Sequence, residues 1–83
     1  MDKIFKAVSE KNHGWIHTRS VANAMRLSGE YRSTTQGNLG KAYYQIRKAL
    51  DAGYLVKAHS SGLWRLTDLG AAWCGAANVA NIP

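Results

Sequence analysis

Apolar residues recur at intervals of three or four positions between residues 39 and 50. Residues with this spacing share one face of an α-helix, so the pattern predicts a helix that packs an inner stripe on the core. The inner stripe comprises Leu39, Tyr43, Ile46 and Leu50. The opposite, polar face comprises Lys41, Tyr44, Gln45 and Lys48. Gly53 tolerates the left-handed conformation and is expected to end this helix.

Two shorter helices are predicted before the long one. The first runs from Asp2 to about Lys11 and ends at Asn12-His13-Gly14. The second runs from Thr18, its expected N-cap, to about Leu27 and ends at Ser28-Gly29. Their inner residues are Ile4, Phe5 and Val8 in the first helix, and Val21, Ala22, Ala24 and Met25 in the second. Between the two, the run Trp15–His17 can add an edge strand to a sheet.

The long helix follows a connector of residues 30–34, and either Thr34 or Thr35 is expected to cap it. Gly37 and Gly40 weaken its first turns. These glycines either let the helix backbone approach a phosphate closely or mark a frayed start.

Two strand-like runs come next, Tyr54–His59 and Leu63–Leu66, joined by a turn in which Gly62 can take a positive φ. Alternation within the second run places Trp64 and Leu66 on the core side, and Arg65 points outward. Thr67 is expected to cap a last helix that runs from Asp68 to about Asn78. The inner stripe of that helix comprises Leu69, Trp73 and Ala76.

Two segments in this order resemble the winged helix-turn-helix family of small DNA-binding domains. Ala49-Leu50-Asp51-Ala52-Gly53-Tyr54-Leu55-Val56 is similar to that family's exit from the third helix, and Trp64-Arg65-Leu66-Thr67-Asp68-Leu69-Gly70 is similar to the end of its wing. The resemblance covers roughly residues 4–73. It implies a mostly helical α+β fold with a three-helix core, a two- or three-stranded β-wing and a C-terminal helix.

The charge of the chain favours an anionic partner. Eleven Lys and Arg residues against five Asp and Glu give a formal net charge of +6. A net positive charge alone is equally consistent with a protein whose charge only keeps it soluble. The charged residues, however, are unevenly distributed along the chain. No acid occurs between Tyr31 and Leu50. The same stretch contains Arg32, Lys41, Arg47 and Lys48.

The polar face of the long helix has side chains suited to DNA. Gln45 can pair with adenine, and Lys41 or Lys48 with guanine. Tyr44 can pack on a sugar or a thymine methyl group, or donate to phosphate, and Arg47 is expected at a phosphate. Further candidate contacts are Arg32, Ser33, Thr35 and Asn38 near the start of the helix, and Lys57, His59 and Arg65 in the wing. The alternative for each of these residues is that it is a solvent-exposed polar side chain without a DNA contact.

Catalytic and metal chemistry have little support, so no enzyme, catalytic residue, metal or cofactor is expected. The histidines and Cys74 have no Cys-x-x-Cys spacing and lie on different predicted elements. Nothing nominates an oxyanion site for a Cys74 nucleophile. Gly37-x-x-Gly40 lacks the lysine and the flanking strand of a phosphate-binding loop.

The sequence therefore predicts a sequence-specific double-stranded DNA-binding protein, a small repressor-like transcriptional regulator. The alternatives are a protein-binding winged helix module, or the DNA-recognition subunit of a larger nuclease or recombination complex. The domain is expected over residues 1–78, with a flexible tail at 79–83. A cytoplasmic protein without membrane attachment is expected, nucleoid-associated if prokaryotic or viral, because the chain has no signal-peptide layout and a single cysteine.

The last helix suggests a homodimer. Beyond Asp68 it carries no charge, whereas a solvated helix face normally carries Lys or Glu. Small residues allow close approach of a second surface. The residues expected there are Ala71, Ala72, Cys74, Gly75, Ala77 and Asn78.

Overall fold

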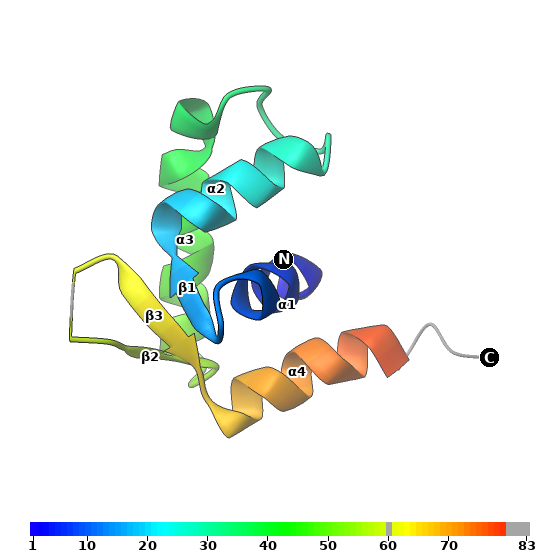
Figure 1. Cartoon of the computed structure of the whole chain (residues 1–83), viewed down its shortest axis with the longest axis vertical. Helices are drawn as coiled ribbons and strands as arrows, with labels where there is room; N and C mark the ends of the chain where they lie inside the picture. The colour runs from blue at the N-terminus through cyan, green and yellow to red at the C-terminus, as the bar shows by residue number, and fades with distance from the viewer. Residues whose placement is uncertain (60, 80–83) are drawn as a thin grey trace.

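The structure, a computed structural model, describes residues 1–59 and 61–79, and side chains as far as Gly75. Within these residues the chain forms four helices and three strands and is mostly helical (Figure 1). The elements are α1 (Asp2–Lys11), β1 (Trp15–His17), α2 (Thr18–Leu27), α3 (Thr35–Asp51), β2 (Leu55–Lys57), β3 (Leu63–Leu66) and α4 (Asp68–Val79). The order and type of every described element agree with the sequence predictions. The expected tail lies almost wholly outside the described residues.

The three strands form one antiparallel sheet in the order β1-β3-β2. In β3, Trp64 is paired with Ile16 of β1 and with Lys57 of β2, whereas Arg65 is paired with Trp15. Paired residues of antiparallel strands project from the same side of the sheet. Trp64 and Ile16 are buried and Arg65 is exposed, so the predicted edge strand and the predicted alternation in β3 are both confirmed.

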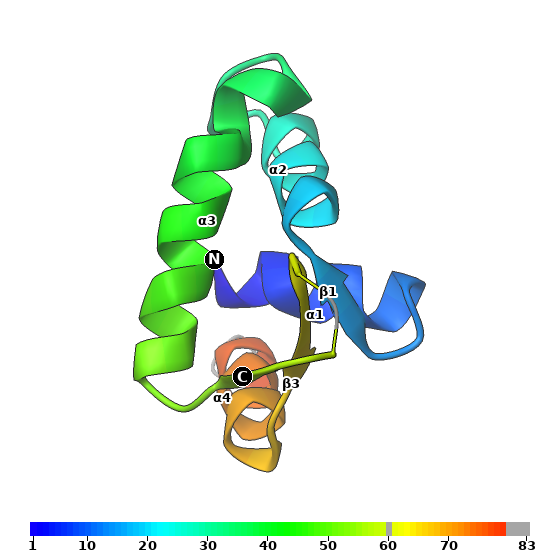
Figure 2. The same ribbon diagram turned by 90° about the vertical axis from the view of Figure 1, so that its left-hand side faces the viewer.

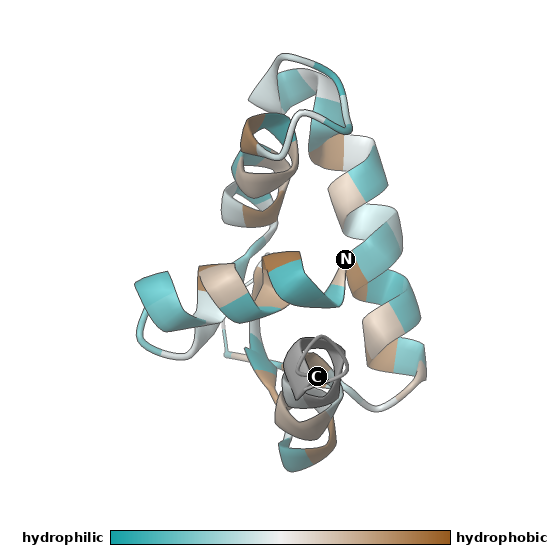
Figure 3. Ribbon diagram, turned by 90° about the vertical axis from the view of Figure 1, so that its right-hand side faces the viewer, coloured by the Kyte–Doolittle hydropathy of each residue, from teal (hydrophilic) through white to brown (hydrophobic). Residues whose placement is uncertain are grey.

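One buried cluster joins the helices and the sheet. It comprises Phe5, Val8, Ile16, Val21, Ala22, Met25, Ala42, Ile46, Ala49, Leu55, Trp64 and Cys74. Figure 3 shows apolar and polar residues alternating along the helices, as expected when each helix turns one side to a core. The expected inner residues of α1 and α2 are confirmed, with Ile4 and Ala24 partly buried against the cluster.

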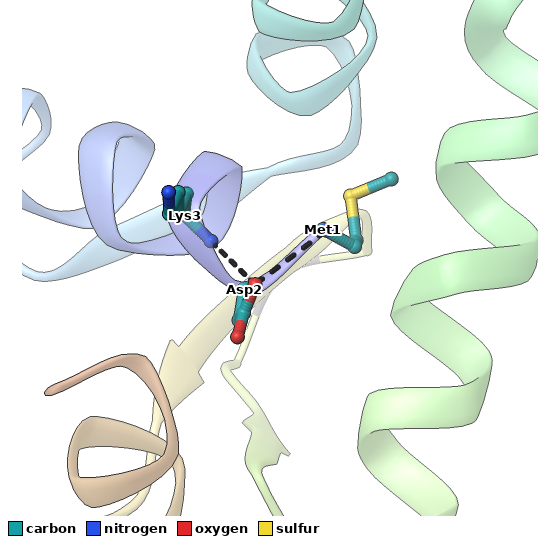
Figure 4. Close-up of polar contacts among 3 residues, drawn as sticks. All are labelled: Met1, Asp2 and Lys3. Atoms are coloured by element: carbon teal, nitrogen blue, oxygen red, sulfur yellow. Dashed lines mark hydrogen bonds and ion pairs between the residues drawn. The ribbon is translucent and has the colours of Figure 1, made fainter. Parts of the chain in front are cut away.

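The N-terminus is held at the start of α1. The Met1 amino group lies 3.6 Å from Asp2 Oδ1, and the Lys3 backbone N–H donates to the same oxygen at 2.9 Å (Figure 4). A carboxylate in the first turn also suits the positive end of the helix dipole. Met1 is partly buried against the core.

The connector between α2 and α3 is fixed by side-chain hydrogen bonds. Thr34 caps α3, because its hydroxyl accepts from the Gly37 backbone N–H at 3.0 Å. Asn38 is fully buried; its Oδ1 accepts from the Arg32 N–H at 3.1 Å, and its Nδ2 donates to the Arg32 carbonyl at 2.8 Å. A Cβ at position 37 would lie 2.8 Å from the Thr34 hydroxyl and 2.9 Å from Arg32 Cδ. Position 37 therefore favours glycine because a larger residue would collide with the connector.

The inner face of α3 differs from the predicted stripe. Its buried residues are Asn38, Ala42, Ile46 and Ala49. Leu39 and Leu50 are only partly buried, and Tyr43 is 52% exposed. The main neighbour of α3 is α2, and alanines at buried positions of α3 allow two helices to approach closely. The helix is thus rotated relative to the prediction, and Tyr43 belongs to the surface.

Two further sequence predictions are wrong. Thr18 is the first residue of α2 and not its cap; its hydroxyl accepts from Trp64 Nε1 at 3.4 Å. In α4, Leu69 is 57% exposed, whereas Cys74, expected on the outer side, is buried. Trp73 is partly buried as expected and stacks on Tyr54 with ring centroids 4.4 Å apart. Ala76, Ala77 and Asn78 lie outside the described side chains.

The start of α4 is tied to the turn that follows α3. Thr67 caps α4, since its hydroxyl accepts from the Gly70 N–H at 3.0 Å, and it donates to the Gly53 carbonyl at 2.7 Å. Gly53 has φ +83°, as expected of the residue that ends α3. Gly70 is buried, and a Cβ there would collide with the Tyr54 carbonyl. In the part of the chain that the structure describes, no helix has the length and apolarity to cross a membrane.

Candidate nucleic-acid interface

The exposed side of α3 carries a row of four residues at helical spacing, Gln36, Gly40, Tyr43 and Arg47, which we name the outer row. At about 100° per residue, all four fall within about 60° of one another around the helix. All are exposed, and nothing lies within 4 Å of the position that a Cβ at Gly40 would take. The row therefore presents an amide, an open backbone position, an aromatic ring and a guanidinium to solvent.

A groove separates α3 from the β2–β3 hairpin. It has a volume of about 310 Å³, and its lining includes Tyr43, Arg47 and Leu50 of α3 together with Lys57 and Trp64 of the sheet. Lys57 is paired with Trp64 and so projects from the side of the sheet that faces the core, but it lies at the edge and is exposed. The structure thus brings Lys57 beside the outer row. We name this feature the hairpin groove.

The four residues predicted as the polar face of α3 differ in exposure and in their position around the helix. Tyr44 is 61% exposed next to the outer row. Lys41 and Lys48 are exposed but lie about 140–160° around the helix from Tyr43, on the flank away from the hairpin groove. Gln45, on that same flank, is half-buried. The predicted face therefore does not form one surface with the hairpin.

Each of the two lysines on that flank forms a cation–π contact with a tyrosine ring. Lys41 Nζ lies 5.7 Å from the centre of the Tyr31 ring, and Lys48 Nζ lies 5.7 Å from the centre of the Tyr44 ring. At exposed sites such contacts contribute only about 0.5–1 kcal/mol. Both ammonium groups can therefore leave the rings to meet phosphates.

The candidate DNA contacts predicted near the start of α3 also differ in exposure. Asn38 is fully buried and bonded to Arg32, so its expected role as a DNA contact is wrong. Thr35 is half-buried, and its hydroxyl donates to Asn23 Oδ1 at 3.1 Å, which ties α3 to α2. Arg32 and Ser33 remain exposed at the tip of the connector.

The hairpin cations lie on two sides of the sheet. Arg65 projects from the outer side, where its guanidinium lies 4.8 Å from the centre of the Trp15 ring. His59 meets the same ring edge-on at 5.9 Å. Of the three predicted wing residues, only Lys57 therefore lines the hairpin groove.

Few acidic groups oppose these cations. The Asp51 carboxylate lies 3.7 Å from Arg47 Nε, but both side chains are mostly exposed. A surface pair of this kind contributes little, so Arg47 can exchange Asp51 for a phosphate or a base edge.

Cys74 and the three histidines are the candidate metal ligands and nucleophile that the sequence offers. In the described residues, no three His, Cys, Asp or Glu side chains lie close enough together to hold a metal ion. Burial raises the pKa of the Cys74 thiol, and the nearby Asp2 carboxylate raises it further. A raised pKa keeps the thiol protonated and unreactive at neutral pH.

Sequence reasoning missed Gln36 and Tyr43. The signal that would have found them is the set Ala42, Ile46 and Ala49, which has the same helical spacing as the stripe that was preferred. Searches against family models, curated proteins and solved structures find no match to this chain.

Proposed function

We propose that this chain is a winged helix domain that binds double-stranded DNA in a sequence-specific manner and acts as a small repressor-like regulator of transcription. In this proposal α3 enters the major groove and the β2–β3 hairpin is the wing. The observation that carries the proposal is that Tyr43 and Arg47 of the outer row line the hairpin groove together with Lys57 of the hairpin.

The outer row suits the reading of base pairs. Gln36 can pair with adenine, and Arg47 can pair with guanine or hold a phosphate, since both side chains offer paired hydrogen-bonding groups. Tyr43 can pack on a thymine methyl group or a sugar. The open position at Gly40 leaves room for the DNA backbone or a base edge near the axis of α3.

Cations around this row can supply affinity. Lys57 lies in the hairpin groove and Arg32 is exposed in the connector, where the hydroxyl of Ser33 can also donate to a phosphate. Lys41 and Lys48 lie on the flank of α3 away from that groove and can reach phosphates beside it. Neutralising phosphates releases counterions, so affinity falls as salt increases. Arg65 and His59 contact DNA in this proposal only if the duplex also reaches the outer side of the sheet.

A salt titration with random and selected duplexes tests the proposal. Anisotropy of labelled duplex DNA should show tight binding at low salt, and log Kd should rise with log salt with a slope of about 0.9 per phosphate contact. A selection from a random duplex pool should yield one sequence motif. Absence of binding at low salt would contradict DNA binding altogether, and a pool without a motif would contradict sequence specificity.

Matched double variants test which side of α3 reads the DNA. Tyr43→Ala with Arg47→Ala should reduce discrimination at particular base pairs by about 1–3 kcal/mol each. Lys41→Ala with Lys48→Ala should weaken binding to all duplexes about equally and flatten the salt slope. The opposite result would restore the face predicted from sequence.

A further inference from the structure

A second groove lies between α1 and α2. Its volume is about 720 Å³, larger than the hairpin groove at about 310 Å³. Figure 2 shows α3 at one side of the molecule and the end of α1 at the other, with α2 between them. The lining of the α1–α2 groove comes mainly from α1 and α2, with Thr35 contributed by the first turn of α3.

The lining of this groove combines small apolar residues with polar ones, among them Asn12, Ser20 and Asn23. Ala7 and Val8 contribute from α1, and Ala24 contributes from α2. At one end stands Leu27, which is 66% exposed although it is a large apolar residue. Leu27 therefore offers an apolar contact to a molecule that occupies the groove.

The charges around the groove have one sign. Lys11 of α1 and Arg19 of α2 are exposed at its rim. No Asp or Glu occurs among the described residues that line it. The acid next to Lys11 in the chain, Glu10, lies 4.0 Å from Lys6 Nζ on another face of α1. An occupant with negative charge flanking an apolar centre would complement this arrangement.

The shape favours a helix over a small molecule. Small ligands bind in pockets that bury most of their surface, whereas Lys11, Arg19 and Leu27 stand exposed along this groove. Ala7 and Ala24 allow a third helix to approach two helices closely. Helices that dock in such grooves insert residues at positions i, i+3 or i+4, and i+7.

We propose that the α1–α2 groove docks an acidic amphipathic helix of a partner protein. The apolar anchors of that helix contact Leu27, Ala24 and Val8, and its carboxylates lie beside Lys11 and Arg19. The groove and the outer row share no residue, so this proposal does not rest on DNA binding.

A selection of peptides on the intact chain tests the proposal. The probe is a displayed library of 16-residue helix-forming peptides in which anchor spacing and net charge vary. The selected peptides should carry apolar residues at i, i+3 or i+4, and i+7, with Asp or Glu beside them. In spectra of the labelled protein, their binding should shift the amide resonances of the groove residues.

Substitutions then locate the site. Leu27→Glu and Lys11→Glu should each raise the peptide Kd by about tenfold or more, which corresponds to about 1.4 kcal/mol. Leu69→Glu, at another largely exposed leucine outside the groove, and Lys48→Glu, on α3, are the matched controls and should change the peptide Kd less than twofold. Both Leu27 and Lys11 are exposed, so these variants should melt like the parent, which calorimetry checks.

Several results would overturn the proposal. These are the absence of any selected peptide, a preference for basic peptides, or equal losses in Leu27→Glu and Leu69→Glu. A dimer in sedimentation that Leu27→Glu disperses would assign the groove to a second copy of the chain. Leu27→Glu should leave duplex affinity unchanged, and Tyr43→Ala with Arg47→Ala should leave peptide affinity unchanged, so the DNA proposal and the docking proposal can fail separately.

Discussion

At the scale of single residues, some polar side chains that are chemically suited to contact DNA instead form hydrogen bonds that hold the fold together. Asn38 and Thr35 both have groups suited to DNA, yet one clamps the connector and the other joins α3 to α2. In the described part of the chain, no buried side-chain nitrogen or oxygen lacks a hydrogen-bond partner. Such residues are expected to affect stability first.

Asn38→Ala should lower the free energy of unfolding by about 1–3 kcal/mol. It removes the two partly buried hydrogen bonds that the fully buried Asn38 side chain makes with the backbone of Arg32, and loss of such partners costs about this much. Urea denaturation of the variant measures the change. Gln36→Ala, on the exposed side of the same helix, is the control and should be nearly neutral. Equal midpoints for the two variants would contradict the clamp.

The Cys74 thiol should react slowly with iodoacetamide at pH 8 in the folded protein and much faster in denaturant. Burial raises its pKa, so less thiolate is present in the folded state than in the unfolded chain. The folded protein therefore holds this proton more tightly. The corresponding stability is present below the ordinary pKa of a thiol and is lost as the pH rises through the raised value. Equal rates in both states would contradict burial.

At the scale of elements, the sequence determined existence and order better than orientation. Turn glycines, caps and periodicity located α1 to α4 and the sheet, because these signals are local. The rotations of α3 and α4 were wrong because Tyr43 and Leu69 resemble core residues, whereas Ala42, Ala49 and Cys74 give weak signals. Which stripe is buried depends on neighbours such as α2, whose positions the sequence of one helix does not contain.

Trp64→Ala should destabilise the protein by about 3–5 kcal/mol, whereas Arg65→Ala should change the melting temperature little. Trp64 is only 7% exposed and joins the sheet to the core, but Arg65 contacts one face of Trp15 at the surface. Thermal unfolding followed by circular dichroism compares the two. A Trp64→Ala protein as stable as Arg65→Ala would show that β3 is displaced by one residue.

Gly40→Ala should raise stability by up to about 1 kcal/mol, because alanine is the better helix former and nothing lies within 4 Å of the new Cβ. If DNA approaches α3 at this position, the same substitution should weaken duplex binding. Melting and anisotropy on one preparation separate the two effects. A variant that is less stable than the parent would mean that position 40 is occupied.

At the scale of the whole molecule, three surfaces lie on different elements. The outer row and hairpin groove belong to α3 and the sheet, the second groove belongs to α1 and α2, and an uncharged surface belongs to α4. The α4 surface includes Leu69, Ala71 and Ala72, all exposed. We retain a homodimer through α4 as a proposal, now without Cys74. None of these surfaces follows from local sequence, since each joins residues of distant segments or depends on helix rotation.

Ala71→Glu should convert such a dimer into a monomer without loss of folding, because a charge would face the second copy. Sedimentation velocity at several protein concentrations measures the change, with circular dichroism as the check on folding. Lys3→Glu, which alters charge at an exposed position of α1, is the control. A parent protein that remains monomeric at every concentration would remove the dimer.

The buried glycine at the start of α4 restricts how this sequence can diverge. A side chain of any size at position 70 would meet the Tyr54 carbonyl and push α4 away from the turn after α3. The stacked pair of Tyr54 and Trp73 would separate with it. In a saturation mutagenesis library selected for folding, position 70 should therefore tolerate fewer substitutions than the large core residues. Related sequences with this fold can therefore exchange one apolar core side chain for another, but position 70 has to remain glycine.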